Sequence, residues 1–316
     1  MLTILVTGAT GFVGNAFVKK ALSLGNDVRV VVRDSSSFSF DSLQCFSVQD
    51  ISKDTNWDGA FVGVDVIVHC AARAHLMRDI SSSPLSAYRE INVAGALNLA
   101  KQAAEAGVRR FVFISSIKVN GESTLPERPF VADDFPAPLD PYGVSKMEAE
   151  HGLRIIAAKT KMKLVIVRPP LIYGPGVRAN FATLLRWVSY GVPMPFGAIH
   201  NARSIVSLDN LLDLLMICLW HPAAVGQTFL VSDGDDVSTT ELLRRTAKAM
   251  GKKIFLLPVP VSYLEFGASL LGKYSVAHRL FSSLQVDIQK TRHLLGWDPP
   301  LTLDEGLKRV VDGMKQ

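Results

Sequence analysis

The sequence contains a tyrosine and a lysine whose spacing suits acid/base chemistry. Tyr142 and Lys146 are four residues apart, so on a helix they project from the same face, one turn apart. A phenol with a reference pKa near ~10 is a poor proton donor or acceptor at neutral pH, and a cationic amine beside it lowers that pKa. The same spacing arises by chance in helices, where a tyrosine packs and a lysine is a surface charge. Whether this pair is functional must therefore be judged from the elements around it.

The N-terminal residues predict an element that binds a nucleotide. Residues 2–7 form a short β-rich apolar run, a glycine-rich turn follows, and residues 12–24 have helical periodicity. In this context Gly8 permits a tight turn, Gly11 lets the backbone approach a pyrophosphate, and Gly14 lets the helix pack on the strand. A glycine turn without a ligand is the alternative. The residues expected to bind the cofactor here are Gly8, Thr10, Gly11, Phe12, Val13 and Gly14.

The end of the second expected strand bears on the choice of cofactor. NAD-binding folds usually place a carboxylate there for the ribose 2′-hydroxyl, whereas this chain has Arg33, then Asp34 and a serine-rich loop at Ser35–Ser39. Arginine and hydroxyl groups suit a 2′-phosphate. We therefore expect NADP, with NAD as the alternative if Arg33 is a surface residue and Asp34 contacts the ribose.

Strand and helix signals alternate along the first half of the chain. This order predicts an α/β fold, a doubly wound parallel sheet of the Rossmann type, in which ligands lie beyond the carboxyl ends of the strands. Donor groups placed there would stabilise a developing alkoxide. Further strands are expected at 43–48, 64–69, 110–115 and 164–168, and helices at 85–106 and 142–159. The residues that follow strands and are expected to bind the cofactor are Asp50, Ile51, Ala71, Ala72, Arg73, Ser115 and Pro169, with Ser116 next to Ser115.

Taken together, the motifs resemble those of extended short-chain dehydrogenases/reductases, in the nucleotide-sugar epimerase, dehydratase and reductase group. The resemblance covers nearly the whole chain. It rests on the following segments: Thr7–Gly14, Asp50–Ile51, His69–Ala72, Asn92, Ser115–Ser116, Tyr142–Lys146 and Arg168–Gly176.

The resemblance implies roles for the residues of the site. Tyr142 would be the general acid/base, Lys146 would hold the nicotinamide ribose and tune Tyr142, and Ser116 would hydrogen-bond the reacting oxygen. Asp50 and Ile51 would lie at the adenine, and Asn92 would be a structural polar residue near the cofactor. Ser115 would contact the cofactor or only cap its strand.

A second, smaller lobe is expected to bind the substrate. We expect residues 1–172 and 203–232 to form the dinucleotide-binding domain, and residues 173–202 and 233–316 an α/β substrate lobe. In the family, arginine and asparagine side chains contact the diphosphate of a nucleotide sugar, and packing or surface charge is the alternative role for the arginines. The expected substrate-binding residues are Ser116, Lys118, Asn180, Arg203 and Arg279.

One segment favours a particular reaction. Dehydratases of the family carry an acid just after the serine, where this chain has Ile117 and Lys118. The segment Ser116–Gly121 looks like that of O-antigen enzymes that reduce UDP-linked 4-keto-6-deoxy-N-acetylhexosamines, giving products such as UDP-N-acetylquinovosamine. We therefore expect a 4-keto reductase of surface polysaccharide biosynthesis. The alternatives are a UDP-hexose or UDP-N-acetylhexosamine 4-epimerase with tightly bound NAD, and a non-catalytic NADP-binding sensor.

Composition excludes several other classes. The net charge is +5 and the pI near 9.1, but the basic residues are scattered among acids, which argues against nucleic-acid binding. The histidines lack metal-ligand spacing. The three cysteines are expected to be buried free thiols of a cytoplasmic protein.

No apolar run reaches the ~18 residues of a membrane span. The apolar stretch 261–271 is expected to form a core helix, with peripheral membrane contact as the alternative. Apolar faces on helices 85–106 and 142–159 would allow a homodimer.

Overall fold

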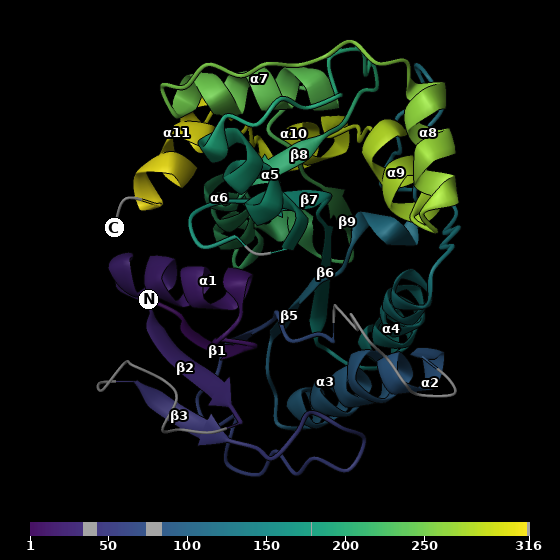
Figure 1. Cartoon of the computed structure of the whole chain (residues 1–316). Coiled ribbons are helices and arrows are strands. Elements are labelled where there is room, and N and C mark those ends of the chain that lie inside the picture. The colour runs from purple at the N-terminus through teal and green to yellow at the C-terminus, as the bar shows by residue number, and fades with distance from the viewer. Residues whose placement is uncertain (34–42, 74–83, 178, 315–316) are drawn as a thin grey trace.

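A seven-stranded sheet forms the centre of the molecule (Figure 1). The computed structural model describes residues 1–33, 43–73, 84–177 and 179–314, without the side chains of residues 179, 180, 275 and 276. All neighbouring strands pair in parallel, in the order β3-β2-β1-β4-β5-β6-β9. This arrangement confirms the predicted doubly wound sheet. Its strands are β1 (Thr3–Thr7), β2 (Asp27–Val32), β3 (Gln44–Ser47), β4 (Val66–His69), β5 (Arg110–Ile114), β6 (Lys163–Arg168) and β9 (Thr228–Leu230).

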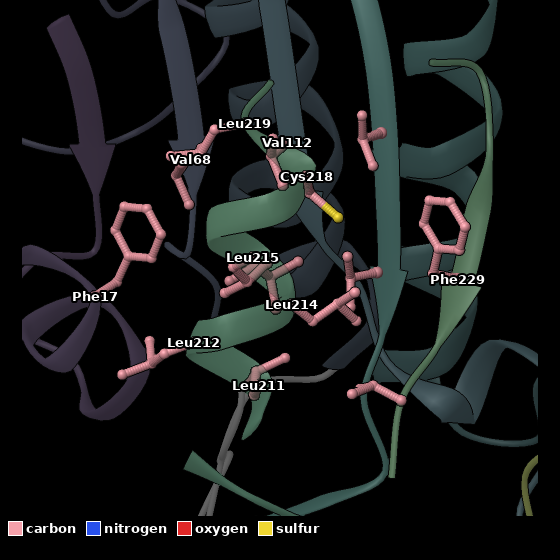
Figure 2. Close-up of a cluster of buried hydrophobic side chains, with 14 of the residues drawn as sticks. Phe17, Val68, Val112, Leu211, Leu212, Leu214, Leu215, Cys218, Leu219 and Phe229 are labelled. Atoms are coloured by element: carbon pink, nitrogen blue, oxygen red, sulfur yellow. The ribbon is translucent and has the colours of Figure 1, made fainter. Parts of the chain in front are cut away.

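Helices cover both faces of this sheet because its strands are apolar on both sides. Alternate residues of β1 separate into two cores: Ile4 and Val6 face α1 (Phe12–Ser23) and α6 (Leu208–Cys218), while Leu5 faces the opposite side. Figure 2 shows the leucines of α6 against the strands. The second face is covered by α3 (Ala96–Glu105) and α4 (Pro141–Lys159).

The helix expected at 85–106 is interrupted by a wider turn. It consists of α2 (Pro84–Tyr88), a π-helical segment η2 (Arg89–Gly95) and then α3. Asn92 lies in η2 and is buried, and it exchanges two hydrogen bonds with the backbone of Arg73, at 2.8 Å and 3.1 Å. A π-helical turn accommodates an extra residue and is frequent near functional sites. Apolar periodicity does not reveal it.

The second lobe has a sheet of its own. β7 (Leu171–Tyr173) and β8 (Ile205–Ser207) pair in parallel with each other, so β8, from the segment 203–232 expected in the dinucleotide-binding domain, lies outside the large sheet. Around this pair lie α5 (Ala179–Tyr190), α7 (Thr239–Ala249) and α11 (Leu303–Gly313).

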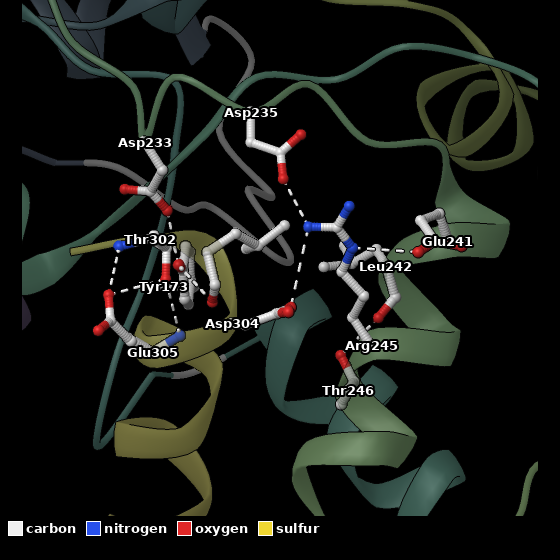
Figure 3. A network of polar contacts seen from close by, with 11 residues as sticks. Tyr173, Asp233, Asp235, Glu241, Leu242, Arg245, Thr246, Thr302, Asp304 and Glu305 are labelled. Atoms are coloured by element: carbon white, nitrogen blue, oxygen red, sulfur yellow. Dashed lines mark hydrogen bonds and ion pairs between the residues drawn. The ribbon is translucent and has the colours of Figure 1, made fainter.

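A polar network joins these elements (Figure 3). The buried Tyr173 hydroxyl donates to Asp233 Oδ2 at 2.6 Å. Arg245 of α7 bonds Asp235 at 2.5 Å and Glu241 at 3.0 Å. The tyrosine that ends β7 is thereby fixed to the loop that follows β9, which holds the small sheet against the large one.

Two sequence expectations about burial are wrong. Cys45 is exposed, because β3 is an edge strand of the sheet, while Cys70 is half-buried and Cys218 buried. The apolar stretch 261–271 forms α8 (Val261–Leu270), but none of this helix is buried. It packs against α9 (Tyr274–Phe281) at the outer edge of the molecule (Figure 1). The remaining elements are α10 (Gln289–Leu295) and the short 3₁₀ turns η3 (Ile117–Val119) and η4 (Pro222–Ala224).

Candidate active site

The glycine-rich turn leaves the start of α1 open to a ligand. Gly8 has φ +69°, and a Cβ there would lie 2.7 Å from the Ala71 nitrogen; a Cβ on Gly14 would lie 2.1 Å from the Gly8 oxygen. A Cβ on Gly11 would meet only the Gly8 oxygen, at 3.1 Å. Among the described residues, no side chain caps α1. Its first N–H groups and positive dipole end are therefore available to a phosphate.

A buried hydrogen bond fixes the strand ends beside this turn. Thr7 Oγ1 and His69 Nδ1 lie 2.8 Å apart, and the Ala71 backbone nitrogen donates to the same hydroxyl at 3.3 Å. Burial lowers the pKa of His69 to about 3, with the Lys146 charge as a smaller cause. The imidazole is therefore neutral, and its part is to hold the end of β4 against the end of β1.

The residues expected at the adenosine end are partly described. Arg33 is exposed at the end of β2, while Asp34 and the serines at 35–39 lie outside the described residues. Asp50 accepts a hydrogen bond from the Ile51 nitrogen at 2.8 Å. A Cβ on Gly95 would lie 2.6 Å from the Ile51 oxygen, so η2 packs directly on this loop.

Tyr142 and Lys146 occupy the first two turns of α4, as expected. The sequence starts the helix at this point because Asp140 is a capping residue and Pro141 suits the first helical position. Asp140 accepts a hydrogen bond from the Gly143 nitrogen at 2.6 Å. The cap thereby fixes the start of the helix, and with it the position of the tyrosine.

Lys146 is an almost fully buried cation, 2% exposed. Its Nζ donates to the Ile114 carbonyl at 2.8 Å and lies 4.5 Å from the centre of the Phe113 ring. Burial lowers the pKa of this amine to about 8, against the opposing effect of Glu150. The amine thus lies at the carboxyl end of β5 and is charged at neutral pH.

The pKa of Tyr142 runs against the sequence-based expectation. It is raised, first by burial and then by Asp140 and Tyr88. The Tyr88 ring meets the Tyr142 ring edge-on, with centroids 5.9 Å apart. Lys146, which we expected to lower this pKa, is not among the groups that shift it. In this arrangement Tyr142 is protonated and is a proton donor.

Ser116 is held beside α4 by the turn that follows it. Its Oγ accepts from the Lys118 nitrogen at 3.3 Å, which starts η3. Lys118 forms an ion pair with Asp140, and a Cβ on Gly143 would lie 2.8 Å from the Lys118 oxygen. The structure thus brings the predicted serine and tyrosine segments together.

Ser115 belongs to a buried polar network under the site. It donates to Glu150 Oε1 at 2.5 Å, and Arg168 binds both oxygens of Glu150, at 2.9 Å and 2.6 Å. Arg168 also donates to Asn120 at 2.9 Å. Sequence reasoning missed Glu150 and Asp140. The Asp-Pro pair before the helix was the available signal for Asp140.

Asn92 connects η2 to α4. Its Nδ2 donates to Ser145 Oγ at 3.0 Å, and the Ser145 hydroxyl donates to the Tyr142 carbonyl at 2.8 Å. Asn92 is thus placed as a structural residue behind the tyrosine.

Two of the predicted substrate residues lie together in the second lobe. Arg203 Nη1 donates to the Arg279 carbonyl at 2.6 Å and to the Ser282 carbonyl at 3.0 Å. Burial lowers the pKa of Arg203. Arg279 is exposed on α9, and Asn180 begins α5 without a described side chain.

The predicted cofactor residues follow consecutive parallel strands. Because the carboxyl ends of parallel strands meet at one edge, these residues share that edge. Following β1 are Gly8, Thr10, Gly11, Phe12, Val13 and Gly14; following β3, Asp50 and Ile51; following β4, Ala71, Ala72 and Arg73; following β5, Ser115 and Ser116; and following β6, Pro169.

Within the described ranges, no group of three His, Cys, Asp or Glu side chains is arranged to hold a metal.

Comparison with known proteins identifies the family. Residues 4–231 match the NAD dependent epimerase/dehydratase family. The chain belongs to this family. It is 50% identical over 315 residues to a Vibrio cholerae protein named UDP-glucose 4-epimerase, covering 99% of this chain and 96% of that one. This agrees with the extended short-chain dehydrogenase/reductase type expected from the motifs.

Two more distant similarities are to proteins that are also named 4-epimerases. An Escherichia coli O157:H7 protein named N-acetyl-α-D-glucosaminyl-diphospho-ditrans,octacis-undecaprenol 4-epimerase is 29% identical, with 98% of this chain and 94% of that one covered. A Bacillus cereus UDP-glucuronic acid 4-epimerase, solved with NAD, has a TM-score of 0.80 at 22% identity, covering 100% and 99% of the two chains. The latter likeness confirms the fold.

Proposed function

We propose that this protein is a 4-epimerase of UDP-linked hexoses or N-acetylhexosamines that works with a tightly bound NAD. The observation that carries the proposal is the 50% identity, over nearly all of both chains, to a protein named UDP-glucose 4-epimerase. This identity favours the 4-epimerase expected as the alternative over the 4-keto reductase.

The glycine turn fits a dinucleotide. Gly8 and Gly14 have no room for a Cβ, whereas the outer side of Gly11 is open, and the α1 N–H groups are uncapped. The family is described as NAD dependent, and the exposed position of Arg33, the basis for expecting NADP, fits either cofactor. We therefore propose NAD rather than NADP.

The chain's own residues would move the protons. NAD, when bound, would supply hydride transfer at C4 of the sugar. We propose that Tyr142 exchanges a proton with the C4 oxygen and that Ser116 hydrogen-bonds the same oxygen. Lys146, one helical turn from Tyr142 and charged below about pH 8, is the cation that would stabilise the phenolate form.

The sugar diphosphate would lie against the second lobe. Arg203 and Arg279 are the proposed diphosphate ligands, since arginine binds phosphate oxygens in a bidentate manner. One relative is named for a UDP-sugar, and the other for a sugar linked through a diphosphate to undecaprenol. We propose UDP, because the relative with the higher identity is named for a UDP-sugar.

The test is interconversion without added cofactor. The purified protein should equilibrate UDP-galactose with UDP-glucose, or the N-acetylated pair, and release NAD on denaturation. A matched reaction contains NADPH and a UDP-4-keto-6-deoxy sugar. If NADPH absorbance falls in that reaction and no 4-epimer forms from either UDP-sugar pair, the protein is a reductase and the epimerase proposal is wrong. Inactivity in both reactions would favour the non-catalytic sensor.

A further inference from the structure

Helix α8 is mostly apolar and yet unburied. All ten of its residues are described, and none is buried. Its polar residues Ser262, Glu265 and Ser269 follow the spacing i, i+3, i+7, so they form one narrow stripe. A helix that is apolar around most of its circumference is ordinarily buried in a core or a membrane. The exposure of α8 therefore indicates a missing partner.

The exposed apolar side chains form a continuous row. Tyr263, Phe266 and Leu270 also follow the spacing i, i+3, i+7, and they are 71%, 66% and 73% exposed. The row continues toward α9, which packs beside α8 at the outer edge of the molecule (Figure 1). We define the α8 surface as Tyr263, Phe266, Leu270, Leu271 and Tyr274.

Positive charge flanks the α8 surface. Lys253 precedes α8 in the sequence and Lys273 follows it, both exposed, and Glu265 is the single acid from 252 to 274. The neighbouring Lys252 donates to the Ser189 carbonyl. Aromatic side chains with flanking lysines are typical of segments that lie in the interface of an anionic bilayer.

We propose that the α8 surface docks on an anionic lipid bilayer, with its apolar side chains among the headgroups and its lysines on the lipid phosphates. The charge pattern favours lipid over a second copy of the chain. A two-fold contact between copies would bring the same patch to both sides and set lysines against lysines. No helix within the described ranges is long and apolar enough to cross a membrane.

Docking would orient the second lobe toward the bilayer. Arg279 belongs to α9, which packs against α8, and its carbonyl accepts from Arg203. The membrane-facing side thus includes the element that contributes to the proposed diphosphate site. The docking proposal stands apart from the proposed function, because it concerns where the protein acts and not what it converts.

Sedimentation with lipid vesicles tests the proposal. The full-length protein is mixed with vesicles of phosphatidylcholine alone, or of phosphatidylcholine and phosphatidylglycerol in equal parts. We expect the native chain to sediment with the anionic vesicles. The double variant Phe266→Ser/Leu270→Ser should bind at least roughly tenfold more weakly, because two large apolar groups no longer enter the interface.

Two further variants make the test specific. Lys253→Glu/Lys273→Glu should weaken binding to anionic vesicles. Leu24→Ser/Trp220→Ser, which changes two exposed apolar residues elsewhere, should bind like the native chain, and circular dichroism checks that each variant is folded. The proposal is overturned if the native chain stays in solution, or if Phe266→Ser/Leu270→Ser binds equally well. A native dimer that this variant dissociates, without vesicle binding, would assign the surface to a second copy.

Discussion

At the scale of single residues, burial sets the proton affinities of the site. Lys146 and His69 both have lowered pKa values because each is buried, whereas the pKa of Tyr142 is raised for the same reason. The Tyr142–Lys146 spacing could be found in the sequence. The raised pKa of Tyr142 could not, because it depends on burial and on Tyr88, which is distant in the sequence.

Removing the Tyr142 hydroxyl should abolish most turnover without loss of fold. We expect Tyr142→Phe to lower the epimerisation rate by roughly 10²–10⁴-fold, the usual contribution of a positioned acid/base. Bound NAD, measured after denaturation, should be unchanged. A variant that keeps native turnover would remove Tyr142 from the mechanism.

Tyr173, a fully buried tyrosine, provides the contrast. Tyr173→Phe leaves Asp233 Oδ2 without its donor at 2.6 Å, which should cost about 1–3 kcal/mol in the free energy of unfolding. Turnover per folded molecule should stay near native. Urea unfolding and activity assays would separate the two effects, and a variant as stable as the native chain would contradict the expectation.

His69 should make the protein less stable in weak acid. Its pKa is about 3 when folded and near ~6.5 when unfolded, so its contribution to stability is present above about pH 6.5 and is lost as pH falls toward 3. Between about pH 6.5 and 5 this single group should lower the free energy of unfolding by about 1.6 kcal/mol.

The variant His69→Phe isolates this titration. This variant lacks the hydrogen bond to Thr7 at every pH. Between about pH 6.5 and 5, however, its free energy of unfolding should fall by about 1.6 kcal/mol less than that of the native chain. Chemical denaturation at both pH values measures the difference. If the free energy of unfolding changed equally with pH in the two proteins, His69 would not titrate in this way.

At the scale of elements, close backbone approach decides which glycines are needed. A Cβ on Gly14 would lie 2.1 Å from a backbone oxygen, while a Cβ on Gly267, also within a helix, would meet nothing within 4 Å. We expect Gly14→Ala to destabilise the fold by about 1–3 kcal/mol or more and to abolish NAD binding. Gly267→Ala should stabilise it by about 0.5–1 kcal/mol. Urea unfolding of both variants is the measurement, and the same sign for both would contradict this account.

Local elements were predictable where their signals are local. The strand, turn and helix around Gly8–Gly14 and the start of α4 follow from capping and periodicity, and both are confirmed. The pairing of β8 with β7 depends on distant segments and was not predictable. The apolar pattern of α8 is the same for a core helix and an exposed one, so the sequence could not show which it would be.

At the scale of the whole molecule, the C-terminal half completes the nucleotide-binding half. α6 covers one face of the large sheet (Figure 2), and β9 adds its seventh strand. Arg110 of β5 donates to the Cys218 carbonyl at the end of α6, at 2.8 Å. The large core is therefore built from segments about a hundred residues apart in the chain.

A fragment that ends before α6 should not fold. Residues 1–203 would leave the apolar face under α6 exposed and lack β9, so we expect no cooperative unfolding transition and aggregation during purification. Co-expression with residues 204–316 should restore a folded complex, checked by size-exclusion chromatography and thermal unfolding. A monomeric fragment 1–203 that unfolds cooperatively would refute this dependence.

The late position of α6 also bears on how the protein is made. At the usual ~5–20 residues per second, a ribosome takes about 5–20 s to extend the chain from Ile114 to Cys218. During that interval α1 is the one helix already made for this face of the sheet, and the part that α6 later covers is unshielded. We therefore expect nascent chains to associate with a chaperone over this interval, and the yield of folded protein to depend on chaperone supply more than on final stability.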